Sequence, residues 1–242
     1  MLDTGRALSP DQTLVPASYG GPKLVCVDIS TNEVVQIIVF PPDVALPESY
    51  LNDIRFDLRS QLTESGKGIA YISDSSSEGK NGIVVVDLGS EESWRVLDTA
   101  SQVHPEPGFV PFIWGTAVYS LPGPTHVNFG VDGIALAADG ESLYFGSVGG
   151  RKLYRVPTSV LRDRSDGAEE RAVAAVESLG ERGVSDGFET DSTGKVYMGN
   201  MEQNGVGVFD PQTGLMDVFV RNRRISWVDT REFCFTDGAS LN

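Results

Sequence analysis

Cysteine and basic residues are scarce in this sequence of 242 residues. The two cysteines, Cys26 and Cys234, are too few for a disulfide scaffold or a zinc site, and both fall in segments typical of strands. Lysine and arginine total 19 against 34 aspartates and glutamates, which gives a formal net charge of −15. Because such a surface repels phosphate backbones and anionic lipid, we expect neither nucleic acid nor a membrane as a partner. The excess of carboxylates favours cations, either metal ions or protonated amines, or serves only solubility.

Long apolar runs and several functional motifs are absent as well. No segment is apolar over the length of a transmembrane helix, and the first residues lack the charged and apolar regions of a signal peptide. Neither a phosphate-binding Gly-x-x-x-x-Gly-Lys loop nor a His-Glu-x-x-His metal motif occurs. We therefore expect no nucleotide hydrolysis, and nucleophilic serine hydrolysis is not expected either.

The sequence does contain many short β-rich runs separated by turn residues, with little that is typical of helix. Residues 172–179 fit a strand or a short helix equally well, and 227–235 begins a set that the chain does not finish. A Pro/Gly-rich stretch at 105–130 predicts a long loop. The expected strands form four sets: 24–28 and 33–40; 51–58, 68–73, 82–88 and 93–97; 133–137, 142–147, 152–157 and 172–179; and 187–190, 195–199, 205–210 and 216–221.

These sets resemble one another. Residues 131–140 carry Asp-Gly at the head of a strand and a tight Gly turn, and 185–194 repeat this arrangement. A weaker copy begins at residue 51. Repeats of roughly 40–50 residues with four short strands are typical of propeller blades. The sequence therefore predicts an all-β propeller as a single domain over residues 1–242.

The repeated acidic residues indicate where chemistry would lie. The first strand of each blade lines the central channel, so the repeat predicts several carboxylates around one channel mouth. Two carboxylates in a dry pocket can be driven apart in pKa and serve as acid and base. Equally, each Asp could cap a tight turn by accepting backbone N–H bonds. The candidate catalytic residues are Asp53, Asp132 and Asp186, and the candidate ligand-binding residues are Asn52, Asp74, Glu202, Gln203, Asn204 and Asp229.

The loop at 105–130 and its border hold both histidines of the chain and several aromatic residues. His104 and His126 could transfer protons near neutral pH, or be ordinary exposed loop residues. The aromatic residues could form a lid over a flat ligand, or pack the loop onto the blades. They are Phe109, Phe112, Trp114 and Tyr119.

An ordered set of motifs across nearly the whole chain resembles the major royal jelly protein and yellow family. The motifs begin with Asp3-Thr-Gly and Ala70-Tyr-Ile-Ser-Asp, and continue with Ser93-Trp-Arg-Val-Leu, Asp132-Gly-Ile-Ala-Leu, Leu153-Tyr-Arg-Val-Pro-Thr and Ser185-Asp-Gly. The resemblance implies a six-bladed propeller, of which this chain supplies an arc of about four blades. The first and last blades would be missing, which leaves two sheet flanks open.

The resemblance also implies a range of functions. Family members include insect proteins linked to melanin chemistry through dopachrome conversion, salivary proteins that bind biogenic amines, and secreted nutritive proteins. It therefore implies an extracellular protein whose channel-mouth pocket binds or isomerises a small aromatic or cyclic metabolite. A secreted binding or structural protein without catalysis is the alternative.

A more distant similarity to gluconolactonase and regucalcin propellers implies a metal-dependent lactonase as a further alternative. Those propellers hold one divalent metal at the channel mouth. The matching positions here are Asn52, Asp132 and Asp186, with Asp132 in the place of a usual Asn. Oxygen ligands of this kind suit calcium or magnesium.

Overall fold

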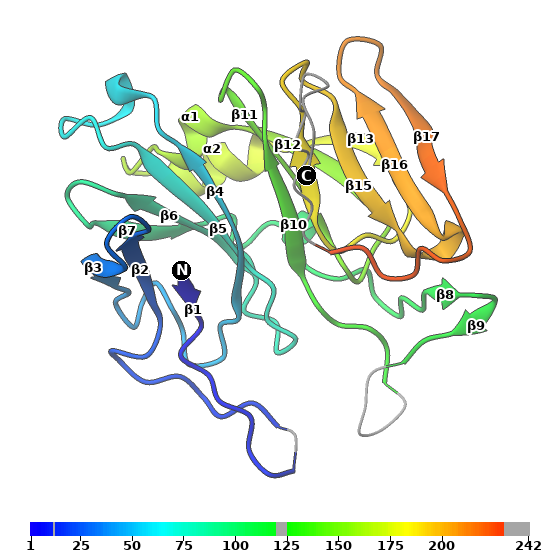
Figure 1. The fold of residues 1–242 in the computed structure, drawn as a ribbon, viewed down its shortest axis with the longest axis horizontal. Coiled ribbons are helices and arrows are strands. Elements are labelled where there is room, and N and C mark those ends of the chain that lie inside the picture. Colours follow the sequence, from blue (N-terminus) through cyan, green and yellow to red (C-terminus); the bar gives the residue numbers. More distant parts are fainter. Residues whose placement is uncertain (12, 120–124, 230–242) are drawn as a thin grey trace.

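Four antiparallel β-sheets stand side by side and follow one another along the chain (Figure 1). The computed structural model describes residues 1–11, 13–119 and 125–229. The first sheet has three strands, β1 (Leu2–Asp3), β2 (Lys23–Asp28) and β3 (Glu33–Val39). The other three have four strands each: β4 (Leu51–Asp57), β5 (Ile69–Asp74), β6 (Gly82–Asp87) and β7 (Ser93–Val96); β10 (Val131–Leu136), β11 (Ser142–Ser147), β12 (Lys152–Pro157) and β13 (Glu177–Glu181); and β14 (Phe188–Thr190), β15 (Val196–Asn200), β16 (Gly205–Asp210) and β17 (Leu215–Arg221).

Each sheet is a meander, because every strand pairs with the next strand in the sequence. The first strands β4, β10 and β14 adjoin one another, with β10 between the other two. This is the arrangement of propeller blades around a channel, so the predicted all-β propeller arc of about four blades is confirmed. In the described residues the sheets do not close into a ring.

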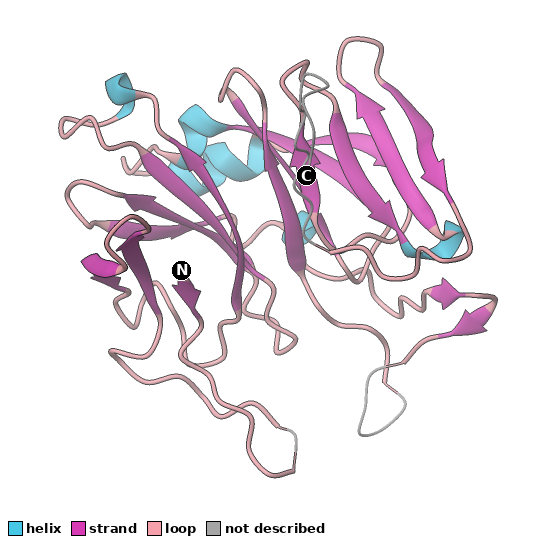
Figure 2. Cartoon of the chain, in the orientation of Figure 1, coloured by secondary structure: helices cyan, strands magenta, loops and turns pink. Residues whose placement is uncertain are grey.

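Little of the chain is helical, as Figure 2 shows. The segment 172–179, which fitted a strand or a helix, divides between the two. Helix α2 (Ala168–Ala174) ends inside it and β13 starts at Glu177. With the shorter helix α1 (Thr158–Leu161), α2 packs against the core between the second and third blades. No helix of the described residues is long and apolar enough to cross a membrane.

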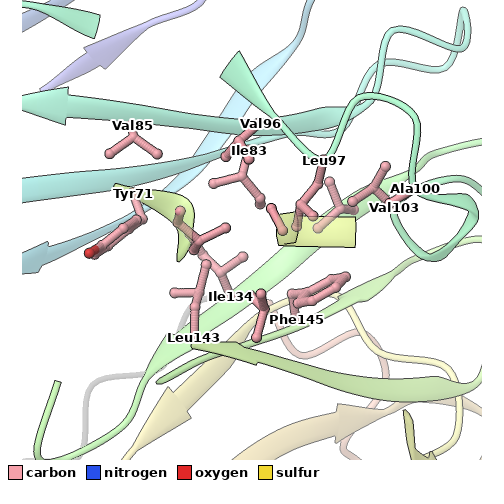
Figure 3. Close-up of a cluster of buried hydrophobic side chains, with 14 of the residues drawn as sticks. Tyr71, Ile83, Val85, Val96, Leu97, Ala100, Val103, Ile134, Leu143 and Phe145 are labelled. Atoms are coloured by element: carbon pink, nitrogen blue, oxygen red, sulfur yellow. The ribbon is translucent and has the colours of Figure 1, made fainter. Parts of the chain in front are cut away.

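Strand β5 is apolar except for Ser73 and Asp74 at its end, because both of its faces are buried between blades. On β5, Ile69 and Tyr71 enter the cluster shared with the third blade, shown in Figure 3. The alternate residues Ala70 and Ile72 enter the cluster shared with the first blade. Burial of each such aliphatic side chain contributes roughly 1.5–3 kcal/mol, so contacts between blades stabilise the arc.

The two outer flanks of the arc carry exposed apolar side chains. Val35 and Ile37 of β3 are 60% and 49% exposed, and Leu215 and Phe219 of β17 are 67% and 53% exposed. An apolar cavity of about 730 Å³ also opens beside β2, with Phe56 of β4 in its wall. Both flanks have the apolar character of blade surfaces that a neighbouring sheet would cover.

The remaining expectations concern loops and the end of the chain. The described residues of the stretch 105–130 are largely irregular, as predicted, but form a small hairpin from β8 (Phe112–Ile113) and β9 (Thr116–Ala117). Residues 227–229 are not in a strand, and the rest of the predicted strand 227–235 lies outside the described residues. Cys26 lies in β2, as predicted, whereas Cys234 falls outside the described part.

Candidate functional site

The first strands of three blades bring Asn52, Asp132 and Asp186 together. Asn52 on β4 donates from Nδ2 to Oδ1 of Asp132 on β10 over 2.5 Å. The Asp132 carboxyl is in turn hydrogen-bonded to Asp186, just before β14. The charges of Asp186 and Asp229 act on the Asp53 carboxyl and raise its pKa. We call the residues Asn52, Asp53, Asp132 and Asp186 the acidic cluster.

The register of the blades shows which positions of the repeat correspond. In the second blade the β4–β5 register shifts between Leu51 and Ile54, and in the third blade the β10–β11 register shifts between Val131 and Ile134. Asn52 is therefore the counterpart of Asp132, and Asp53 is the counterpart of Gly133. The weaker sequence copy thus differs from the others by placing an acidic side chain where they have glycine.

The glycine of each Asp-Gly pair makes room for the next blade. A Cβ on Gly133 would lie 2.2 Å from the backbone oxygen of Asp186. A Cβ on Gly187 would lie 2.5 Å from the backbone oxygen of Asp229. The pair therefore recurs because the backbone at one blade's Asp passes directly over the preceding blade's Gly, which places Asp186 beside Asp132.

Asp132 holds its proton more tightly than an ordinary aspartate. Its residue is 6% exposed, and this desolvation raises the pKa of its carboxyl well above the ordinary value. The neighbouring Asp186, through its charge and hydrogen bond, raises this pKa further, as does the charge of Asp53. The bond from Asn52 acts in the opposite direction. These effects make Asp132 a candidate general acid of the site.

The pKa of the Asp53 carboxyl is raised as well. Burial raises its pKa to about 6, against the lowering effect of the Arg55 guanidinium and with the help of Asp229 and Asp186. Its Oδ2 is buried and has no hydrogen-bond partner among the described residues. A carboxyl with this pKa can both take and release a proton near neutrality, as an acid–base residue must.

Two residues that the sequence analysis did not select belong to the same site. The indole nitrogen of Trp227 donates to Oδ2 of Asp186, and the Trp227 residue is 49% exposed. Arg55 stands two residues after Asp53 and donates to the backbone oxygen of Phe188. The sequence could have indicated Trp227 only through its place two positions before the candidate residue Asp229. Nothing in the sequence distinguishes Arg55 from other arginines in strands.

Asp74 has a structural role. It is completely buried, and Oδ2 is 2.8 Å from Nη1 of Arg95. Its Oδ1 accepts from the backbone nitrogens of Tyr50 and Ser76 at 2.8 and 3.3 Å. The carboxylate is thus occupied by the protein itself.

The predicted group Glu202, Gln203 and Asn204 lies at the border of the third and fourth blades. Glu202 pairs with Arg151 at 2.6 and 2.7 Å and accepts from the backbone nitrogen of Phe112 at 3.0 Å. Gln203 contributes backbone bonds, and Asn204 adopts φ +53° and bonds to Ile225. These contacts match the alternative of a blade turn whose backbone groups are satisfied.

The histidines and aromatic residues of 105–130 do not gather into one lid. Phe109 is buried beneath the Arg151 guanidinium, which lies 4.8 Å from its ring centre. Trp114 is 66% exposed at the tip of the β8–β9 hairpin. His104 Nδ1 lies 3.0 Å from Oδ1 of the buried Asn81, and His126 lies beside Tyr119. Phe109 thus packs the loop onto the blades.

The sequence contains one Gly-x-Ser-x-Gly pattern, at 183–187. Ser185 is completely buried, and its hydroxyl donates to the backbone oxygen of Gly187 at 3.2 Å. The segment leads into strand β14 instead of a helix, unlike a nucleophile elbow. The pattern is therefore part of the blade repeat.

The side chains of the acidic cluster are not arranged as a preformed metal site. Among the described residues no group of three or more His, Cys, Asp or Glu side chains is placed to hold a metal. Asn52 also presents its N–H group to Asp132 instead of its oxygen. A calcium or magnesium ion would require the Asn52 amide to turn over and the Asp132 carboxyl to be ionised.

Comparisons with known proteins agree with this architecture. The family model described as major royal jelly protein matches residues 1–228. Major royal jelly protein 5 of Apis mellifera is 26% identical over 196 residues, which cover 81% of this chain and 28% of that protein. The chain therefore spans less than a third of the curated relative's length.

Solved structures show the fold alone. A nidogen/laminin complex matches with a TM-score of 0.50 and 11% identity, over 86% of this chain and 61% of that one. Regucalcin of Agrobacterium tumefaciens, described as a calcium-binding protein, matches with a TM-score of 0.45 and 18% identity, over 85% and 56%.

Proposed function

The chain belongs to the major royal jelly protein family, and we propose that it binds a small aromatic or cyclic metabolite at the acidic cluster and shifts a proton on it. The observation that carries this proposal is the hydrogen-bonded pair of Asp132 and Asp186 beside Asp53. Acidic groups that lie close together, with raised pKa values for Asp53 and Asp132, are typical of acid–base sites. The propeller supplies the rigid frame, since each group sits at the start of a blade.

The proposed isomerisation needs a base and an acid. Asp53, once ionised, would take a proton from the ring carbon of an enolisable or quinonoid ligand. Asp132 would give its proton to the oxygen or nitrogen where the electron pair arrives. No electron leaves the ligand, and return of the proton from Asp53 to Asp132 through water restores the site. The Trp227 indole offers a flat apolar surface beside Asp186, against which an aromatic ring can stack.

A metal-dependent lactonase remains the second candidate, because Asn52, Asp132 and Asp186 are oxygen-bearing groups on three adjacent first strands. This function requires a rearranged cluster, as described above. Extracellular location and a purely binding role without catalysis are further proposals that the family resemblance supports.

A thermal-shift screen of the full protein tests these functions. Planar amines, quinones and cyclic esters would be added one by one, each with a chelator and then with calcium. A ligand present at a hundredfold excess over its Kd stabilises the folded state by about 2.7 kcal/mol. A rise with amines or quinones in chelator supports the proposal. A rise that requires calcium supports the lactonase instead.

The matched variants are Asp186→Asn and Asp166→Asn. Asp166 is exposed, so its substitution removes the same charge without touching the cluster. If ligand shifts persist in Asp186→Asn, the ligand binds elsewhere and the proposal is wrong.

A further inference from the structure

Asp53 and Arg55 each bury a polar atom that lacks a hydrogen-bond partner among the described residues. These atoms are Oδ2 of Asp53 and Nε of Arg55. The two side chains are 12% and 16% exposed, so water reaches them poorly. Buried polar groups in folded proteins are nearly always hydrogen-bonded, and an unpaired charged group is costly. An acceptor and a donor, two positions apart on β4, are therefore left open and need a partner.

Arg55 forms long ion pairs with two carboxylates and hydrogen-bonds to neither. Its Nη2 lies 3.8 Å from Asp53 and 3.7 Å from Glu189, longer than a charge-assisted hydrogen bond. Its Nη1 and Nη2 donate instead to the backbone oxygens of Ile54 and Phe188. These two bonds hold the guanidinium in place. Its planar fork of N–H groups, however, makes no paired hydrogen bonds to a carboxylate.

Three other arginines of this chain hydrogen-bond to a carboxylate. Arg59 lies 2.7 Å from Asp57, Arg95 lies 2.8 Å from Asp74, and Arg151 lies 2.6 Å from Glu202. All three close on an acidic side chain at hydrogen-bonding distance. The buried Arg182 also bonds to backbone oxygens instead of a carboxylate, but its Nε, Nη1 and Nη2 all donate. Arg55 differs from it by an Nε that has no partner among the described residues.

Arg55 is connected to the acidic cluster through Asp53. The charges of Arg55, Asp186 and Asp229 all act on the Asp53 carboxyl. The site therefore offers acidic groups for a cation and, within reach of the same carboxyl, a guanidinium with an open N–H. A ligand with only an amine would leave the Arg55 Nε–H without a hydrogen-bond partner. A ligand with only a carboxylate would be repelled by the acidic cluster.

We infer that the ligand of the acidic cluster is zwitterionic, with a protonated amine against Asp132 and Asp186 and a carboxylate on the Arg55 fork. This inference rests on the proposed function and names the class of its ligand, an aromatic α-amino acid or a compound of the same charge pattern. Arg55 is the specificity-determining residue for the carboxylate.

Calorimetric titration with three matched probes tests the inference. Phenylalanine has both charges, phenethylamine has only the amine, and 3-phenylpropionate has only the carboxylate. We expect the full protein to bind phenylalanine tighter than phenethylamine by about tenfold or more, since a hydrogen bond to a charged group is worth that much. We expect no measurable binding of 3-phenylpropionate.

The variants Arg55→Met and Arg55→Lys identify the source of this preference. Arg55→Met should bind phenylalanine and phenethylamine equally, with the Kd of phenethylamine changed by less than about threefold. Arg55→Lys keeps the charge but not the planar fork, and should keep part of the preference. It also serves as the test if Arg55→Met does not fold. Arg224→Met, at an exposed arginine, should behave as the wild type.

The outcomes separate the two claims. If phenethylamine binds the wild type as tightly as phenylalanine, or if both Arg55 variants keep the full preference, the zwitterion inference is overturned while the proposed site stands. If neither compound binds, nor any member of the screen above, the proposed function fails and the inference fails with it.

Discussion

Nδ2 of Asn52 donates to Oδ1 of Asp132 over 2.5 Å, and so joins the first strands of two neighbouring blades. The two residues occupy the same position of the blade repeat. Asp132 then bonds to Asp186, the third copy of that position. Three copies of one repeat position thus form a hydrogen-bonded row along the channel mouth. The row is stable because its first member, Asn52, is an amide. It donates an N–H to Asp132, whereas a third carboxylate at this position would repel the other two.

The raised pKa of Asp53 predicts a pH dependence of stability. The ordinary pKa of 3.8 describes the unfolded chain, and the folded value is about 6. Between these values the folded state holds a proton that the unfolded state has lost, so the free energy of unfolding falls as pH rises from about 4 to about 6. Two pKa units correspond to about 3 kcal/mol.

Urea unfolding at a series of pH values checks this, with Asp53→Asn beside the wild type. The decline should be shallower in Asp53→Asn than in the wild type, because only the contribution of Asp132 remains there, while Asp166→Asn should keep the full decline. Equal slopes for wild type and Asp53→Asn would show that Asp53 titrates normally.

Glycine at the repeat position is predicted to be required for packing between blades. Gly133→Ala and Gly187→Ala would place Cβ atoms 2.2 and 2.5 Å from backbone oxygens of the next segment. Such overpacking typically costs about 1–3 kcal/mol. Gly207→Ala is the control, because its Cβ would have no neighbour closer than 3.6 Å. Thermal melts should show losses for the first two variants and little change for the third; a neutral Gly133→Ala would contradict the packing assigned to the pair.

The buried pair of Arg95 and Asp74 is predicted to serve stability and not ligand binding. Arg95→Met leaves a completely buried carboxylate without its partner, which costs about 3–5 kcal/mol. Arg164→Met removes an exposed pair with Glu92 and should cost less than about 1 kcal/mol. Denaturant unfolding measures both. A loss for Arg95→Met as small as that for Arg164→Met would mean that Asp74 is free for another partner.

Trp227 is predicted to report ligand binding. Its indole bonds to Asp186, so a ligand at the acidic cluster changes the surroundings of this ring. We expect tryptophan fluorescence to change on ligand addition, and the change to disappear in Trp227→Phe. Trp114→Phe is the control, because Trp114 lies on the β8–β9 hairpin. If the signal survives Trp227→Phe and is lost with Trp114→Phe, the ligand lies near the hairpin.

Local patterns predicted the blades well. Alternation and turn residues placed β11, β12 and β16 at their observed bounds, because each strand's pattern is a property of adjacent residues. The segment around Ala172 was ambiguous because its short apolar run fits either period. Helix α2 and strand β13 share it, and pairing of β13 with β12 decides the boundary.

The site was only partly predictable. The Asp-Gly repeat located Asp132 and Asp186, since the repeat itself sets their common place. Arg55 was missed because its contact with Phe188 spans 133 residues of sequence. Glu202 resembled a channel residue, yet its carboxylate pairs with Arg151. Partners so distant in sequence leave no local signal, and only the folded arrangement shows them.

The most direct test of the central claim is a calorimetric titration of wild type, Asp132→Asn and Asp166→Asn with one ligand from the thermal-shift screen. We predict that Asp132→Asn weakens binding by about tenfold or more, because the amide cannot ionise and so removes a charge-assisted partner of the ligand. Asp166→Asn should bind as the wild type. Unchanged affinity in Asp132→Asn would contradict the assignment of the acidic cluster as the ligand site.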